Sequence, residues 1–166
     1  MKRLLVIILV LASSCVWGQT FTTDKIKATP AYRMTASLSV DVENPPAGIA
    51  SFNSEVEDVG DCYATSTVTY TVPETGLYAV MIGAGGGTAQ YWGMEARIYA
   101  GGSTEDRSKV TKSYAYLGTT GGDGASVGCR ILYLTKGDTI RPWLVTTVSS
   151  GTLQKDNVIF SVISIY

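Results

Sequence analysis

Apolar and polar residues alternate along much of the chain with the period of a β-strand. Between Tyr32 and Val40, the residues Tyr, Met, Ala, Leu and Val alternate with Arg, Thr, Ser and Ser, which predicts a strand with one face toward a core. Further strand-length apolar segments, separated by turn residues, span 52–59, 65–72, 77–82, 92–100, 110–117, 125–135, 138–148 and 157–166. No segment after residue 30 has a helical pattern, so the chain is expected to fold as an all-β sandwich.

Proline and glycine mark where these strands end. Pro73 cannot donate to a sheet ladder and belongs at a strand end, and Gly76 can adopt a positive φ in the turn that follows. The segments 65–72 and 77–82 are therefore predicted to form a β-hairpin. The run Gly-Ala-Gly-Gly-Gly at 83–87 is predicted to be a flexible linker, and 118–124 a second loop rich in Gly and Thr.

Aromatic and turn residues in the first half of the chain recur at fixed spacings. Five residues separate Phe52 from Asp58, four separate Asp58 from Tyr63, six separate Tyr63 from Tyr70, five separate Tyr70 from Gly76, and Tyr78, Val80 and Ile82 then alternate. This spacing resembles the signature of the complement C1q globular-head family, with Val80 and Ile82 where aromatic residues are usual. The segment 132–138, which ends in Gly137 and Asp138, and the last segment, which contains Phe160, resemble later strands of that family.

The resemblance implies a ten-strand jelly-roll, a fold shared with the tumour necrosis factor cytokines, that assembles as a homotrimer without enzymatic activity. The C1q-like globular domain would span 32–166, after a flexible N-terminal segment at 19–31. No Gly-x-y repeat precedes it, so the collagen stalk of many family members is absent. The expected core residues are Phe52, Tyr63, Tyr70, Leu77, Leu132, Leu134 and Phe160.

The first 18 residues have the organisation of a secretory signal peptide. Lys2 and Arg3 precede a short apolar run at 4–12, and small residues lead to Gly18. This run is shorter than the roughly 18 residues of a membrane-spanning helix. The mature protein is therefore expected to be secreted and extracellular, with no stable membrane insertion. A type II membrane anchor and a bacterial lipoprotein signal at Cys15 remain as alternatives.

Composition excludes several function classes. The chain contains no histidine, which removes Ser-His-Asp and Cys-His catalysis, the usual zinc sites and a histidine pH switch. The formal net charge is −1 and no basic cluster occurs, so the sequence lacks the electrostatic footprint of a nucleic-acid-binding protein. These features favour a binding protein over an enzyme.

Two cysteines, Cys62 and Cys129, remain beyond the predicted signal peptide. A pair of cysteines in a secreted chain usually forms a disulfide. The prediction is a Cys62–Cys129 bond within one subunit. Two free thiols, or a bond between subunits, are the alternatives.

Candidate ligand-binding residues lie in the predicted loops, where rigid sandwiches often carry function. The polar candidates are Glu105, Asp106, Arg107, Asp123, Asp156 and Asn157. Calcium is a candidate ligand because its sites need several convergent oxygens, although solvated loop charges are the favoured interpretation. Tyr91 and Trp92 could form an exposed platform for a sugar or a protein, and core packing of Trp92 is the alternative.

The predicted homotrimer rests on strands that carry apolar side chains on both faces. Ile131 and Tyr133 flank Leu132, and Ile163 and Ile165 occur beside Val162. A monomer would expose an apolar patch of the kind that marks an interface. The function predicted is a lectin-like or innate-immune recognition module for carbohydrate, microbial-surface or protein ligands. A structural matrix, coat or mucus component built from trimers, and a receptor ligand like the tumour necrosis factors, are the alternatives.

Overall fold

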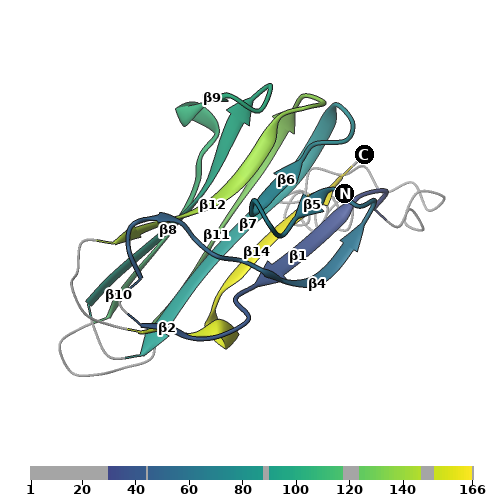
Figure 1. Cartoon of the computed structure of the whole chain (residues 1–166). Coiled ribbons are helices and arrows are strands. Elements are labelled where there is room, and N and C mark those ends of the chain that lie inside the picture. Colours follow the sequence, from purple (N-terminus) through teal and green to yellow (C-terminus); the bar gives the residue numbers. More distant parts are fainter. Residues whose placement is uncertain (1–29, 44, 88–89, 118–123, 147–151, 166) are drawn as a thin grey trace, which may run out of the picture.

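The protein is a sandwich of two antiparallel sheets in a computed structural model that describes residues 30–43, 45–87, 90–117, 124–146 and 152–165 (Figure 1). The predicted signal peptide at 1–18, nearly all of the segment at 19–31, and Asp123 lie outside the described residues. Within these ranges the structure contains two short 3-10 turns, η2 (Arg107–Lys109) and η3 (Lys155–Asn157), and no α-helix.

Each sheet contains seven strands. Sheet A has the order β4 (Ser54–Val59), β1 (Arg33–Ser37), β14 (Ile159–Ser164), β7 (Gly76–Gly87) and β11 (Gly124–Leu134). The short strand β13 (Thr152–Leu153) pairs with the end of β7, and β2 (Val42–Glu43) pairs with β13. Sheet B has the order β10 (Thr111–Leu117), β8 (Gln90–Ala100), β12 (Thr139–Thr146), β6 (Thr69–Thr71) and β5 (Tyr63–Ala64), with β3 (Gly48–Ile49) beside β12 and β9 (Thr104–Glu105) beside β8. The two antiparallel sheets confirm the predicted all-β jelly-roll.

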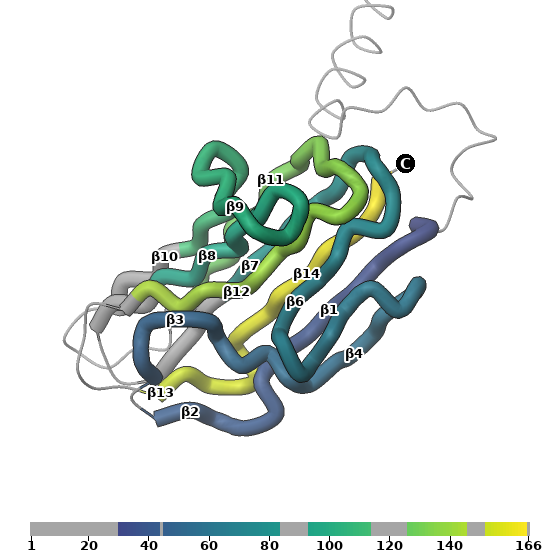
Figure 2. Tube along the Cα trace, turned by 45° about the horizontal axis from the view of Figure 1, so that its top comes forward, coloured from purple at the N-terminus to yellow at the C-terminus, as the bar shows by residue number. Residues whose placement is uncertain are grey.

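The chain reverses at two opposite ends of the sandwich. One end carries β9, η2 and the turn between β11 and β12, while the other carries β2, β13 and η3 (Figures 1 and 2). This division decides which loop residues can meet.

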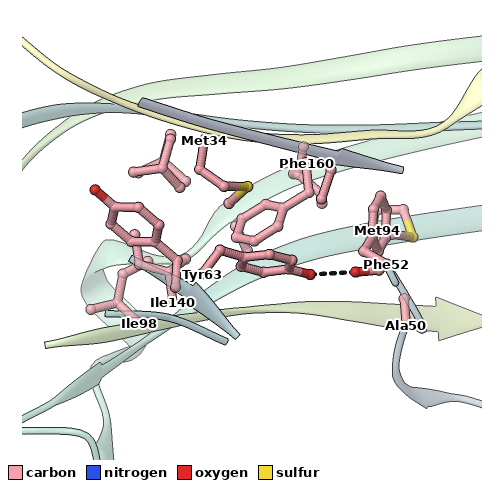
Figure 3. Packing of buried hydrophobic residues seen from close by; sticks show 14 of the residues in the cluster. Met34, Ala50, Phe52, Tyr63, Met94, Ile98, Ile140 and Phe160 are labelled. Atoms are coloured by element: carbon pink, nitrogen blue, oxygen red, sulfur yellow. Dashed lines mark hydrogen bonds between the residues drawn. The ribbon is translucent and has the colours of Figure 1, made fainter. Parts of the chain in front are cut away.

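The regularly spaced aromatic residues meet in the core between the sheets. Phe160 packs edge-on against Phe52 and Tyr63, with ring centroids 6.1 and 6.0 Å apart. The Tyr63 hydroxyl donates to the Phe52 carbonyl (Figure 3), and the Tyr63 amide donates to Asp58 Oδ2 over 2.8 Å. Phe52, just before β4, and Tyr63 of β5 are thus packed against β14, because aromatic pairs of this geometry add to the gain from area burial.

Gly137 and Asp138 lie in the turn between β11 and β12. Gly137 has a φ of +88°, which a side chain would strain. The buried Asp138 accepts hydrogen bonds from the amides of Thr135 (2.9 Å) and Gly101 (3.1 Å). The Lys-Gly-Asp turn therefore fixes the β11–β12 connection against the end of β8.

The prediction that Leu77 belongs to the core is wrong. Its side chain is 42% exposed, whereas Tyr78, Val80 and Ile82 in the same strand are at most 2% exposed. Successive strand residues point to opposite faces, so the burial of Tyr78 places Leu77 outside. The other six expected core residues are buried: Phe52, Tyr63, Tyr70, Leu132, Leu134 and Phe160.

The glycine run at 83–87 is not a flexible linker but the second half of β7. Gly85 pairs with Ala125, and Gly86 pairs with Gly124 and Leu153. A Cβ at Gly83 would lie 2.8 Å from Ile159 Cγ2 and 3.2 Å from Val127 Cγ2. Glycine therefore allows β7 to continue between two crowded neighbours, because it adds no side chain at that point.

Candidate functional site

The structure divides the predicted loop residues between the two ends of the sandwich. Glu105, Asp106 and Arg107 lie at the end that carries β9, while Asp156 and Asn157 lie in η3 at the other end. Tyr91 and Trp92 lie in the first part of β8, where Trp92 pairs with Ala115 and Thr146; their side chains, like Asp123, are outside what the structure describes. The structure therefore does not bring the predicted residues together as one site.

The carboxylates of the β9 loop are neutralised within their own surroundings. Glu105 lies 3.9 Å from the Arg97 guanidinium and 3.7 Å from that of Arg107. Asp106 caps η2 by accepting hydrogen bonds from the Ser108 hydroxyl (2.6 Å) and amide (3.1 Å). These hydrogen bonds lower the pKa of Asp106, so a local structural role accounts for this carboxylate.

The polar residues of η3 bond within their own turn or face solvent. The Asn157 amide donates to Gln154 Oε1, and Asp156 is exposed. Within the described ranges, no three Cys, Asp or Glu side chains come together as a group that could hold a metal ion. The described geometry therefore adds no support for the calcium hypothesis.

The predicted Cys62–Cys129 disulfide is not formed. Both thiols are free; Cys62 is buried and Cys129 is exposed. Cys62 lies in the core cluster and donates to the Gly60 carbonyl over 3.2 Å, whereas Cys129 lies opposite Met81 on the outer face of sheet A. The sequence shows both cysteines, but it does not show which of them points into the core and which to the outer face.

The outer face of sheet A carries a contiguous set of apolar side chains. They are Leu77, Ala79 and Met81 of β7, Val127, Cys129, Ile131 and Tyr133 of β11, and Ile159 and Ile163 of β14; we refer to them as the apolar face. The register sets Tyr133 opposite Leu77 and Ile131 opposite Ala79. Val127, Ile131 and Tyr133 are 63%, 51% and 61% exposed. Exposure of this extent over neighbouring strands is typical of an interaction surface.

The same face becomes polar toward β1 and β4. The Thr35 and Ser161 hydroxyls are hydrogen-bonded at 3.1 Å, and Arg33 forms an ion pair with Glu57 at 2.6 Å. The apolar face thus has a defined polar border, as protein interfaces do.

The outer face of sheet B carries a charged and aromatic cluster that sequence reasoning missed. Its members are Glu95, Arg97 and Tyr99 of β8, Lys112 of β10, and Arg141 and Trp143 of β12; we refer to them as the charged face. Arg97 and Arg141 are directly opposite one another in the ladder. The Arg97 guanidinium lies 4.2 Å from the centre of the Trp143 ring, and that of Arg141 lies 5.0 Å from the Tyr99 ring. Each arginine is therefore held by a cation–π contact.

Glu95 balances the positive charge on one side of the charged face. Its carboxylate is 2.9 Å from Arg97 and 3.3 Å from Lys112. Burial opposes ionisation of Glu95, but the hydrogen bonds from Arg97 and Lys112 outweigh it and lower the pKa. The alternation of Arg141 and Trp143 with the buried Ile140 and Leu144 was the sequence signal that could have located this face.

Solved structures with the same fold share little sequence with this chain. The globular domain of zebrafish complement 1qA protein matches with a TM-score of 0.60 at 14% identity, over 83% of this chain and 98% of that one. Eiger TNF from S. frugiperda matches with a TM-score of 0.60 at 11% identity, over 83% and 94% of the two chains. Murine APRIL matches with a TM-score of 0.61 at 10% identity, over 81% and 98%.

Sequence comparisons gave no further relatives. No protein-family model matches the chain, and no curated protein matches it. The part of the chain that the structure describes contains no helix long and apolar enough to cross a bilayer. Since the structural neighbours cover more than four-fifths of the chain, the protein has the jelly-roll fold of the C1q globular heads and tumour necrosis factor ligands.

Proposed function

We propose that the protein is a secreted, non-enzymatic recognition head that assembles as a homotrimer and binds extracellular carbohydrate or protein ligands. The observation that carries this proposal is the apolar face on β7, β11 and β14. Its exposed valine, isoleucine and tyrosine side chains favour association over a free monomer. The structural neighbours support this class because they are C1q and tumour necrosis factor domains.

Association would also explain how modest sites on single heads could give useful affinity. A trimer presents three copies of each surface, and linked copies raise the overall avidity by orders of magnitude when a ligand can engage more than one. Sheet B and both ends of the sandwich would remain available for ligands, since the apolar face belongs to sheet A.

A matched pair of valine substitutions tests the proposed assembly surface. Val127 in the apolar face is 63% exposed, and Val56 in the edge strand β4 is 68% exposed. Val127→Asp would place a charge in the interface and is expected to give monomers, because an unpaired buried charge is costly. Val56→Asp should leave the assembly intact. Equal masses for the two variants by light scattering would reject the apolar face as the interface.

The ligand class needs a separate measurement. Binding of the protein lacking residues 1–18 to a glycan array, with and without calcium, should detect carbohydrate recognition. Binding that requires calcium would implicate the loop carboxylates, including Asp123, whereas binding without calcium would direct attention to the two sheet faces. If no glycan on the array binds, the proposed ligand is a protein.

A further inference from the structure

We propose that the charged face of sheet B binds the carboxylate of an acidic sugar, such as a uronate, between Arg141 and Arg97. This inference deepens the proposed function, on which it rests, by naming a site and a ligand class. The charged face carries an electrostatic imbalance on a surface that is otherwise well paired.

Arg141 is the unbalanced member of the charged face. Two like charges directly opposite in an antiparallel ladder destabilise the sheet, yet Arg141 is directly opposite Arg97. Arg97 has Glu95 at 2.9 Å and Glu105 at 3.9 Å. Among the described residues, by contrast, no carboxylate lies within ion-pair distance of Arg141. One guanidinium therefore faces its like-charged neighbour without an anion of its own.

The arginines are also held ready for a ligand. Arg141 is half-buried and stacked on Tyr99, and its Nε is buried without a hydrogen-bond partner. A stacked guanidinium keeps its planar fork of N–H donors, which matches a carboxylate. Because the aromatic contacts restrict both side chains, less conformational entropy is lost on binding.

The neighbouring groups favour a sugar over an acidic peptide. Glu95 and Glu105 lie beside the site, and their carboxylates can accept hydrogen bonds from sugar hydroxyls, which the side chains of an acidic peptide lack. Ile49, opposite Trp143 in the ladder, is 45% exposed and offers an apolar contact to the C–H groups of a sugar ring.

The test measures binding of tetragalacturonate to the protein lacking residues 1–18 by isothermal titration calorimetry. Arg141→Gln should weaken binding about tenfold or more, as expected for the loss of a charged hydrogen-bonding group. Lys155→Gln removes the same charge from η3 at one end of the sandwich and should bind as the unmodified protein does. Arg141→Lys should recover part of the affinity, since it restores the charge without the fork. Thermal unfolding of each variant checks that it is folded.

The inference would be overturned by undetectable binding of tetragalacturonate to a folded protein, by equal affinity of Arg141→Gln and Lys155→Gln, or by equal binding of a neutral tetrasaccharide. Tetraglutamate binding as tightly as tetragalacturonate would also reject it, in favour of an acidic peptide. Light scattering on the same samples separates this inference from the proposed assembly: a trimer that does not bind tetragalacturonate contradicts only the sugar site, and a monomer that binds it contradicts only the trimer.

Discussion

Substitution of Gly128 by alanine tests how the two sheets are joined at one edge. Gly128 lies in β11 at the edge of sheet A, beside β10 at the edge of sheet B. A Cβ at Gly128 would lie 2.0 Å from the Lys112 carbonyl oxygen and 2.6 Å from its carbon. These are backbone atoms, so no side-chain rotation can relieve the overlap. The β10 strand would have to move away from β11.

Three hydrogen bonds at this edge set the expected cost. The Ser113 hydroxyl donates to the Ser126 carbonyl over 2.6 Å, and Arg130 donates to the carbonyls of Val110 and Ser108 over 2.9 and 3.1 Å. Hydrogen bonds contribute about 0.5–1.5 kcal/mol each, and more when one partner is charged. Their loss should lower the free energy of unfolding by about 3 kcal/mol, a large part of the roughly 5–15 kcal/mol typical of a domain.

Urea unfolding at a fixed protein concentration measures this change, with Gly101→Ala as the matched control. Nothing lies within 4 Å of a Cβ at Gly101, whose φ is +56°, so the control carries only the left-handed backbone penalty of about 1 kcal/mol. An unfolding free energy for Gly128→Ala no lower than that for Gly101→Ala would refute the close approach of β10 and β11.

Three further outcomes follow from the core and the thiols. Phe160→Ala should lower the unfolding free energy by about 3–5 kcal/mol in urea titrations, because Phe160 is fully buried against Phe52 and Tyr63; a loss below about 1 kcal/mol would contradict this packing. Burial raises the pKa of the Tyr63 and Tyr70 phenols, so their folded forms retain protons that the unfolded chain releases above about pH 10. These two groups should therefore leave the stability unchanged below pH 10 and lower it above pH 10. A midpoint of urea unfolding that is the same at pH 9 and at pH 11 would count against their burial. Cys62 is buried, and burial raises its thiol pKa, so alkylation followed by peptide mass spectrometry should modify Cys62 only after unfolding; modification of Cys62 at the same rate in the folded and the unfolded protein would show that it is accessible.

The sequence was sufficient for the fold because the residues that specify it have fixed environments. Phe52, Tyr63 and Phe160 meet in one cluster, and an aromatic residue at each of their positions is needed to fill it. The turn at Gly137 needs a positive φ, which few residues other than glycine tolerate. Such requirements leave a spacing in the sequence that can be recognised without a structure.

Features that depend on which strands are neighbours could not be predicted. Leu77 was misplaced because an apolar run does not show which of its alternating residues faces inward. The glycines of β7 have the sequence pattern of a linker, and their crowding by Val127 and Ile159 is a contact between distant segments. The charged face was missed for the same reason, since the pairing of Arg97 with Arg141 exists only in the register of β8 and β12.

The mass of the protein in solution tests the central claim most directly. Light scattering on the protein without residues 1–18, at micromolar concentration, should give three times the mass of one chain, because the apolar face exposes Val127, Ile131 and Tyr133 in an isolated subunit. Conversion of the trimer to a monomer by Val127→Asp, but not by Val56→Asp, would place the interface on sheet A. A single-chain mass for the unmodified protein would contradict the trimer and remove the avidity on which the proposed recognition function depends.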